Sequence, residues 1–371
     1  MQVQVVDPSA YTPPYDHALC AALARAGADV SLETSRFLYG PVPREQGYRV
    51  DERFYRRSTR RGLASRLRMP LKLAEHTPDM LRYRRVARRA DVVHYQWLTV
   101  QPLDVWLLPR ARPRVMTAHD VLPREPRRGQ VDATRRLLRR MDAVVVHSQP
   151  GAARLREELG VAAERVHVIP HGAFDYLTRL PDEVSLPREL AGVQGPVVLC
   201  FGLVRPYKGI DVLLEAFRDV RGAELWVVGM PRMDMAPLRR LAERAPGTVR
   251  FVERFVTDPE VPAFFRRADV VVLPYREIDQ SGVLYTALAF AKPLVLSRVG
   301  GFVELGERHG AARLVPPGDP SSLAGALNGL LLDQEARGRL SAGAAAVAAG
   351  PYSWDAVAEQ TLVLYRDLLG R

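Results

Sequence analysis

Short apolar runs alternate with helix-like stretches along most of this 371-residue chain, and this alternation constrains the fold more than any other feature. In the first half the apolar runs cover residues 2–7, 30–33, 91–97, 114–120, 143–148 and 166–172. Runs of this kind, apolar throughout and rich in valine, are typical of strands that are buried on both faces. Because helical stretches separate them, they predict a parallel sheet covered by helices, which is an α/β fold.

The alternation breaks once and then restarts. Residues 175–195 contain two prolines and no long apolar run, so we interpret them as a linker. Further strands are predicted at 197–202, 225–229, 249–255, 269–275, 293–299 and 313–315. We therefore predict two doubly wound domains, 1–174 and 196–350, and a terminal segment, 351–371, with a helix at 354–369. Ligands of such sheets bind at the carboxyl ends of the strands, and we expect a cleft between the two sheets.

The composition argues against several classes of protein. An apolar content of 47% and a charged content of 26% are typical of a packed globular chain. No apolar run approaches the roughly 18–20 residues that cross a bilayer, and residues 1–11 lack the features of a signal peptide. We therefore expect a cytoplasmic protein. Cys20 and Cys200 fall in a predicted helix and a predicted strand, where they suit small core residues rather than a disulfide or a zinc site.

Arginine supplies nearly all of the positive charge, and its clustering is informative. The net charge is +11, and the segment Arg53–Arg89 is strongly basic, with Glu75 and Asp79 as its only acids. Leucines recur at four-residue spacing within this segment, at positions 63, 67 and 71. The segment is therefore either a solvated basic face or an amphipathic surface that rests on an anionic membrane. Nucleic acid is the less favoured partner, because no nucleic-acid-binding module accompanies the charge.

Two prolines bear on the structure of this basic segment. Pro70 and Pro78 each remove a backbone N–H donor and clash with the preceding turn of a helix. We therefore expect them to interrupt any single helix between residues 53 and 89.

A cationic loop follows the first strand of the second half. That strand ends at Gly202, and Arg205 and Lys208 lie three residues apart in the loop that precedes the next helix. A planar guanidinium and a lysine ammonium at the carboxyl end of a strand complement a diphosphate. Gly209 allows the backbone to turn closely at this point.

A second phosphate-binding element is predicted where a polar loop enters a helix. The strand at 269–275 is followed by the polar residues 276–281, and a helix begins at Ser281 and Gly282. A helix N-terminus presents free backbone N–H groups and the positive end of the helix dipole, which suits a phosphate. Both elements follow strands of one sheet, so we expect them to converge on one site.

These stretches resemble a known family. GLVRPYKGIDVLLEAF, VVVLPY and QSGVLYTALAFAKPLVLSRVGGFVE, in this order, are similar to the nucleotide-sugar half of GT-B glycosyltransferases of family 4, in a QSGV-type variant. TAHDVLP, VVVHS and VIPHG resemble the N-terminal half of the same family. The resemblance covers most of the chain and is more specific in the second domain than in the first.

The resemblance implies a fold and an activity. In the GT-B fold two Rossmann-like domains face each other across a cleft, the first binding the acceptor and the second the nucleotide sugar, and the last helix packs back on the first domain. Family members are retaining transferases that move a sugar from a nucleoside diphosphate to an acceptor hydroxyl without a metal or another cofactor. The implied acceptor is a glycan, a glycolipid or a small molecule, in cell-envelope polysaccharide or glycolipid synthesis at the inner membrane face.

The resemblance also assigns residues. Arg205 and Lys208 would hold the leaving diphosphate and neutralise the charge that develops on it. His119, which ends a strand of the first domain, would bond a hydroxyl of the donor sugar and steady positive charge at the anomeric carbon. The other implied donor-binding residues, including three backbone N–H groups at the helix start, are Gly202, Gly209, Phe255, Val256, Ser281, Gly282, Val283, Gly300, Gly301 and Glu304.

The chain departs from the family pattern at two acidic positions. Many members carry two glutamates with seven residues between them, and this chain has Ile278 and Thr286 at those positions. Glu277 and Asp279 flank the first position, and one of them is expected to take its role on the donor.

The first domain departs from the pattern as well. The loop after its first strand, DPSAYTPPYDH, lacks the paired glycines that are common in the family, so we expect Tyr11, Tyr15 and Asp16 to border the acceptor instead. His94, His147 and His171 also end strands, and we interpret these three as structural residues.

Two other function classes stay open from the sequence. A catalytically silent nucleotide-sugar-binding or scaffold protein on the same fold would explain the missing glutamates. A nucleic-acid-binding protein would explain the basic composition. Donor-dependent release of a nucleoside diphosphate separates the enzyme from the silent protein, and salt-sensitive retention on DNA without such release would favour the third class.

Overall fold

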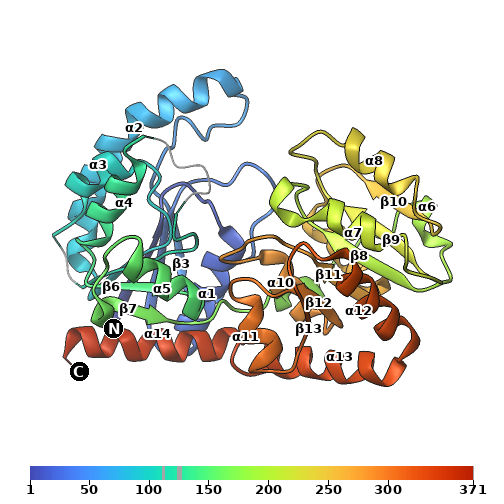
Figure 1. Ribbon diagram of the computed structural model, residues 1–371. Coiled ribbons are helices and arrows are strands. Elements are labelled where there is room, and N and C mark those ends of the chain that lie inside the picture. Colours follow the sequence, from blue (N-terminus) through green and yellow to red (C-terminus); the bar gives the residue numbers. More distant parts are fainter. Residues whose placement is uncertain (111–112, 123–127, 371) are drawn as a thin grey trace. The chain divides into compact units, whose positions relative to one another are not determined.

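The chain divides into two compact units in the computed structural model, which describes residues 1–110, 113–122 and 128–370 (Figure 1). Unit 1 comprises Met1–His171 and Trp354–Arg371, and unit 2 comprises Gly172–Ser353. Each unit is built on one parallel sheet, and each sheet separates two apolar cores formed with its covering helices. This confirms the predicted α/β class with two doubly wound sheets.

The sheet of unit 1 has the order β3-β2-β1-β4-β5-β6-β7 among the described residues, and every neighbouring pair is parallel. Strand β1 pairs with β2 on one side and with β4 on the other, so the loops that follow β1 and β4 diverge at a topological switch point. The strands are β1 (Gln2–Asp7), β2 (Asp29–Thr34), β3 (Arg49–Glu52), β4 (Val92–Tyr95), β5 (Arg114–Thr117), β6 (Ala143–Val146) and β7 (Val166–Val168). The helices are α1 (Pro13–Arg25), α2 (Ser65–Val86), η1 (Ala87–Arg89), α3 (Gln101–Leu107), α4 (Gln130–Leu138), α5 (Gln149–Glu157), η2 (Ala163–Arg165) and α14 (Trp354–Leu369).

The sheet of unit 2 has the order β10-β9-β8-β11-β12-β13, again parallel throughout. Its switch point lies between β8 and β11, and the loops that follow these two strands contain both predicted phosphate-binding elements. The strands are β8 (Val197–Phe201), β9 (Glu224–Val228), β10 (Val249–Val252), β11 (Val270–Leu273), β12 (Leu294–Ser297) and β13 (Arg313–Val315). The helices are η3 (Asp175–Arg179), α6 (Arg188–Ala191), η4 (Pro206–Lys208), α7 (Ile210–Ala216), α8 (Ala236–Ala242), η5 (Asp258–Glu260), α9 (Val261–Arg267), α10 (Gly282–Ala289), α11 (Phe302–Glu307), α12 (Pro320–Leu332) and α13 (Gln334–Ala349).

The C-terminal helix α14 is part of unit 1, far in sequence from the rest of that unit (Figure 1). Its residues at helical spacing, among them Val357, Ala358 and Tyr365, are fully buried against α1 and the sheet. The Tyr365 hydroxyl lies 2.5 Å from His94 Nδ1, while Thr117 Oγ1 lies 2.8 Å from the other ring nitrogen of His94. A buried histidine bonded on both ring nitrogens has a structural function, as predicted for His94.

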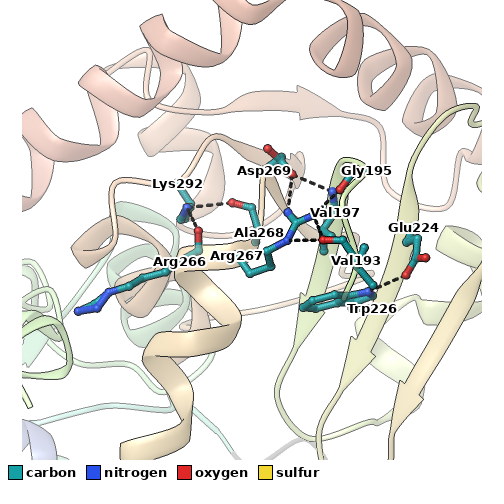
Figure 2. A network of polar contacts seen from close by, with 10 residues as sticks. All are labelled: Val193, Gly195, Val197, Glu224, Trp226, Arg266, Arg267, Ala268, Asp269 and Lys292. Carbon is teal, nitrogen blue, oxygen red and sulfur yellow. Dashed lines mark hydrogen bonds and ion pairs between the residues drawn. The ribbon is translucent and has the colours of Figure 1, made fainter. Parts of the chain in front are cut away.

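The stretch predicted as a linker, 175–195, lies within unit 2 and is tied to it by side chains. Leu177 and Leu190 are buried in a core of that unit. Figure 2 shows Arg267, at the end of α9, donating to the carbonyl oxygens of Val193 and Gly195 and to the Asp269 carboxylate. Asp269 in turn accepts from the backbone N–H of residue 197 at 2.8 Å, where β8 begins. This network holds the entry to β8 at the amino edge of the sheet.

Helix α2 corrects the prediction that Pro70 and Pro78 interrupt any helix in the basic segment, because both lie inside one continuous helix, Ser65–Val86. The helix continues because the backbone groups that lose a hydrogen bond to each proline lie on its exposed side. Both prolines are exposed, as are Arg66 and Ala74, whose carbonyl groups lose their helical partners and are open to water. Buried residues in the second half of the helix, such as Tyr83, hold it against unit 1.

Strand β3 was not predicted from the sequence. Its residues RVDE are charged and only partly buried, and it pairs with β2 as the edge strand of the sheet. An edge strand needs no apolar face on its outer side, and charged side chains there discourage pairing with another chain. The apolar pattern that identifies central strands is therefore missing.

Candidate functional site

The cationic loop and the helix start predicted to bind phosphate meet in unit 2. Gly202 directly follows β8, and a Cβ atom at this position would lie 2.8 Å from Lys208 Nζ and 2.9 Å from Val283 Cγ2. The lysine ammonium and the first turn of α10 therefore approach each other directly above the end of β8. Lys208 is 5% exposed, and its Nζ donates to the Phe201 carbonyl oxygen at 3.3 Å.

Tyr275 connects these two elements from below. The Lys208 ammonium lies 5.1 Å from the centre of the Tyr275 ring, within the range of a cation–π contact. The Tyr275 hydroxyl lies 3.3 Å from Ser281 Oγ, at the N-cap of α10. One buried aromatic ring thus positions both the cation and the residue that begins the helix.

Helix α10 begins without a side-chain cap. Ser281 has extended backbone dihedrals, and its side chain is directed to Tyr275 rather than to the N–H groups of the first turn. Leu284 N–H returns to the Ser281 carbonyl oxygen, which leaves the earlier amides of the turn, at Gly282 and Val283, oriented outward from the helix end. The dipole of the helix adds positive potential at the same place.

The two loops are also fastened to each other at their outer side. Arg276, in the loop after β11, forms a two-pronged ion pair with Asp211 of α7, at 2.9 and 2.6 Å, and donates to the Pro206 carbonyl oxygen. Partial burial works against ionisation of Asp211, but the Arg276 guanidinium holds the pKa of its carboxyl below the usual value. The backbone N–H of Arg276 bonds to the Tyr207 carbonyl oxygen at 2.8 Å. Arg205, by contrast, is exposed on the same loop.

Glycines allow the loop backbones to come this close. Gly209 has φ +63°, and a Cβ there would lie 2.1 Å from the Pro274 carbonyl oxygen. At Gly300 a Cβ would lie 1.9 Å from the Ile278 carbonyl oxygen, which brings the loop at 276–281 against the turn before α11. Gly301 is the N-cap of α11.

The remaining predicted donor residues differ in exposure. Glu304, in the first turn of α11, is half-buried and paired with Arg308 at 3.0 Å. Glu277 is exposed and Asp279 is half-buried, both in the loop between β11 and α10. Phe255 is 54% exposed and Val256 is buried, just after β10. Nothing in these contacts tests their predicted roles.

A ring cluster occupies the carboxyl ends of the strands in unit 1. His119 is stacked on Trp97, with ring centres 5.1 Å apart and planes at 10°, and it meets the edge of Tyr15 at 4.6 Å. Tyr15 also contacts His171, at 4.8 Å, and Tyr11 contacts Trp97, at 4.5 Å. The structure thus brings His119 together with the predicted acceptor-side residues Tyr11 and Tyr15.

A chain of hydrogen bonds decides the protonation of His119. Burial lowers the pKa of His147 to about 4 and that of His119 well below its ordinary value, and nearby histidines lower the latter further, so both rings are neutral. His147 Nδ1 lies 2.9 Å from the Ile169 carbonyl oxygen and must donate to it, which leaves His147 Nε2 to accept from His119 Nδ1 at 3.4 Å. His119 Nε2 is then an acceptor.

Gln96 must therefore supply the donor to His119. The structure places Gln96 Oε1 3.1 Å from His119 Nε2, whereas Gln96 Nε2 is one of the buried atoms without a hydrogen-bond partner among the described residues. We infer that the amide is turned by 180°, so that its NH₂ group donates to His119 Nε2, since this orientation gives a partner to both of these nitrogens. His119 is held on both edges as a neutral ring.

The comparisons with known proteins place the chain in a family. Residues 15–173 match the family model described as Glycosyltransferase Family 4, and residues 195–333 match the model described as Glycosyl transferases group 1. A D-inositol 3-phosphate glycosyltransferase from Xylanimonas cellulosilytica is 30% identical over 310 residues, covering 76% of this chain and 73% of that protein. The chain belongs to glycosyltransferase family 4. This confirms the family that the sequence resembles.

Other relatives align with part of their length. An alpha-D-kanosaminyltransferase from Streptomyces kanamyceticus is 28% identical over 248 residues, 64% of this chain and 63% of that protein. A GDP-mannose:glycolipid 4-beta-D-mannosyltransferase from Xanthomonas campestris pv. campestris is 29% identical over 56% of this chain and 61% of that protein. This family 4 chain thus spans somewhat over half the length of these curated relatives.

Solved structures of the same fold cover the whole chain. Anabaena Alr3699/HepE, solved in complex with UDP-glucose, superposes with a TM-score of 0.73 at 20% identity, covering 99% of this chain and all of that one. Sucrose-phosphate synthase from Thermosynechococcus elongatus gives a TM-score of 0.72 at 20% identity over 100% and 99% of the two chains. The family 4 chain therefore has the GT-B fold, as predicted.

Sequence reasoning missed three residues of the two sites. Tyr275 and Trp97 each come directly after a buried strand, and an aromatic residue at that position is a signal that could have been used. Gly229 follows β9, and a Cβ there would lie 2.2 Å from the Gly202 carbonyl oxygen. A glycine at a strand end is a weaker signal, because many glycines occupy open turns.

The close approach at Gly209 predicts a stability difference between two alanine variants. Gly209→Ala and Gly222→Ala both place a Cβ on a backbone with positive φ, +63° and +72°, which costs about 1–2 kcal/mol in each. Only at Gly209 does the added Cβ meet another backbone atom, so Gly209→Ala should lose clearly more free energy of unfolding than Gly222→Ala. Urea unfolding of both variants measures this, and equal losses would contradict the close approach.

Proposed function

We propose that the chain is a retaining, metal-independent glycosyltransferase that moves a sugar from a nucleoside diphosphate to an acceptor hydroxyl. The observation that carries the proposal is the convergence of the Lys208 ammonium and the N-terminus of α10 above Gly202, at the switch point of unit 2. Membership of glycosyltransferase family 4 supports transfer, and the structural neighbours solved with UDP, glucose or UDP-glucose support a nucleotide-sugar donor. Retention and metal independence rest on the family resemblance alone.

The chemistry demanded of unit 2 is electrostatic. When the bond between the anomeric carbon and the diphosphate oxygen breaks, its electron pair stays on the diphosphate, while the acceptor oxygen bonds to the anomeric carbon and gives up its proton. Lys208, Arg205 and the amides at 281–283 would stabilise the added negative charge on the diphosphate. Lys208 is already fixed by Phe201 and Tyr275, so little reorganisation is needed.

His119 would act from unit 1 as a neutral hydrogen-bonding ring. Because its pKa is far below its ordinary value, it would not serve as an acid at neutral pH. It could take a hydroxyl of the donor sugar on Nε2 only if Gln96 shares that nitrogen. Glu277 or Asp279 would contact the donor in place of the family's first glutamate.

We expect Lys208→Met to weaken nucleoside diphosphate binding and to abolish transfer, because it keeps the buried stem and removes the charge. Loss of a charged hydrogen bond corresponds to about tenfold to a hundredfold in affinity, and Arg205→Ala should act in the same direction. Arg313→Ala is the matched control, since Arg313 is an exposed arginine at the opposite, amino end of a strand of the same sheet. Calorimetry with UDP, GDP and ADP, together with diphosphate release from their sugars, tests this. Normal turnover in both Lys208→Met and Arg205→Ala would remove the site assignment.

His119→Ala should reduce kcat more than it weakens donor binding, because the ring is proposed to act on the sugar while the diphosphate is bound by unit 2. His147→Ala is an informative companion, since it removes the partner that orients His119 but not the ring itself. Steady-state kinetics at saturating donor measure the effect. An unchanged kcat in His119→Ala would refute the role.

A silent binding or scaffold protein is the second candidate function. Thr286 stands where many family members have a glutamate, and its hydroxyl is bonded to the Gly282 carbonyl oxygen at 3.0 Å. Donor binding without diphosphate release, across a panel of donors and acceptors, would favour this candidate over the transferase.

The acceptor and a membrane contact form a separate part of the proposal. One relative is named as a mannosyltransferase that acts on a glycolipid, and we propose for this chain an acceptor in glycolipid or cell-envelope polysaccharide synthesis. Helix α2 supports a contact with an anionic membrane, because Leu67, Met69 and Leu73 are each at least half exposed and stand among exposed arginines. Within the described residues, no helix combines the length and the apolar character needed to cross a membrane.

Flotation with vesicles tests the membrane contact. We expect retention on vesicles with anionic lipid, little retention on neutral vesicles, and release as salt rises. Replacing Leu67, Met69 and Leu73 together by serine should reduce retention severalfold, whereas Leu332→Ser, at an 89% exposed leucine of unit 2, should not. Equal binding to both vesicle types would count against the proposal.

A further inference from the structure

A cavity of about 530 Å³ opens in unit 1 beside the loop that follows β1. It lies between the start of α1, the ends of β2 and β3 and the chain at 42–45. Its volume falls in the range of about 300–1,000 Å³ that is typical of small-molecule sites. Its position at the carboxyl ends of β1 and β2, next to the switch point of the sheet, is where α/β folds bind ligands. Its lining includes Asp16, His17, Ser35, Phe37, Arg44, Glu45 and Glu52.

Asp16 is the observation that points to a ligand. Its side chain lines the cavity and the residue is 1% exposed, yet Oδ1 has no hydrogen-bond partner among the described residues. A buried carboxyl oxygen without a partner costs free energy, so its retention needs an explanation such as a ligand hydroxyl. The neighbouring Asp7 differs, since its carboxyl accepts from the backbone N–H groups of Ser9, Tyr11 and Thr12.

The charge of the two aspartates follows from these contacts. Burial raises the pKa of both carboxyl groups, that of Asp16 well above its ordinary value, and the Asp7 carboxylate raises the pKa of Asp16 further. At Asp7 a hydrogen bond with Asp16 and three backbone amides work against the effect of burial and favour the charged form. Asp7 is therefore the ionised member and Asp16 retains a proton, so that the pair carries one negative charge. The negative charge of Asp7 favours the charged form of Lys72 in α2, but Lys72 is not among the residues that line the cavity.

Other polar groups in the wall suit hydroxyls. His17 is neutral, because burial lowers its pKa to about 4, and its Nδ1 is fixed by the Tyr48 hydroxyl at 2.6 Å. The Ser35 side chain is buried at the end of β2 and can both donate and accept. Phe37, half-buried, supplies an aromatic wall against which the apolar face of a sugar ring can pack.

The charged residues of the lining argue against an anionic ligand. Glu45 and Glu52 face a single lining arginine, Arg44, and Glu52 is paired at 3.3 Å with Arg36, which is not among the lining residues. Together with the charge on the aspartate pair, this leaves no surplus of positive charge for a phosphate. A phosphate group here would lose hydration without gaining a cationic partner.

We propose that this cavity binds an uncharged, hydroxyl-rich unit of the acceptor, a sugar or a cyclic polyol, with Asp16 taking one of its hydroxyls and Phe37 packing on its ring. That the ligand is the acceptor rests on the proposed function. That the ligand is uncharged and rich in hydroxyls rests on the residues of unit 1 alone. It deepens that function by excluding acceptors that place a phosphate in this cavity.

The test measures ligand binding to the full chain by saturation-transfer NMR and by competition, without a donor. The probes are glucose and myo-inositol, each against its monophosphate, glucose 6-phosphate and inositol 3-phosphate. We expect the uncharged member of at least one pair to bind tenfold or more tightly than its phosphate. Phosphates that bind equally or better would overturn the proposal.

Variants locate the binding in the cavity. Asp16→Leu should reduce binding of the uncharged probe at least tenfold, whereas Asp16→Asn, which keeps a neutral hydrogen-bonding group, should retain part of it. If Asp16→Leu fails to fold, Phe37→Ala tests the same site, because loss of its ring should also reduce binding of the uncharged probe. Trp106→Ala is the matched control, because Trp106 is a 70% exposed aromatic residue of unit 1 that does not line the cavity. Undiminished binding in Asp16→Leu and Phe37→Ala would overturn the proposal.

Nucleoside diphosphate binding, measured on the same samples, separates the two hypotheses. Suppose that nucleoside diphosphates bind and that Lys208→Met weakens their binding, but that the cavity variants do not change binding of the uncharged probes. The inference about the cavity then fails and the proposed function stands. If uncharged probes depend on the cavity but no diphosphate or nucleotide sugar binds, the acceptor assignment fails together with the proposed function.

Discussion

The approach of three loop backbones at the carboxyl edge of the second sheet is the constraint on which the candidate donor site depends. Glycines 202, 209 and 300 stand where any side chain would collide with the lysine ammonium or with a carbonyl oxygen. Because these residues carry no side chain, the loop after β8 and the helix start after β11 come close enough for a cation and backbone amides to act on one anion. The ion pair between Arg276 and Asp211 holds the same loops from outside.

Most of the second unit could be predicted from the sequence, because its inner strands β8, β9, β11 and β12 are mostly buried and therefore largely apolar. The convergence of the loop at 203–209 with the helix start at Ser281 was expected because both follow strands of one doubly wound sheet. The aromatic ring of Tyr275 did not follow, since a tyrosine at a strand end is equally compatible with a core position. Its role depends on which atoms lie above it, and sequence periodicity does not contain that information.

The first unit was harder to predict, for reasons that differ between elements. Edge strand β3 has no apolar pattern because one side of it faces water. Helix α2 tolerates two prolines because the carbonyl groups that they leave without a helical partner, at Arg66 and Ala74, are open to water. The histidines at strand ends were interpreted one by one, whereas the structure bonds His119 directly to His147, with Gln96 on the outer side of His119 and the Ile169 carbonyl oxygen on the outer side of His147. The protonation of each ring is a property of that chain of bonds and not of a single residue.

The membership of α14 in the first unit has a consequence for biosynthesis. The hydroxyl of Tyr365 completes the bonding of His94, a residue of β4 in the first sheet. A nascent chain that does not yet contain α14 would therefore expose the apolar surface of α1 that this helix covers, while unit 2 already has all of its described strands. Folding during synthesis should then run from the middle outward, and the amino-terminal part should depend longest on chaperones.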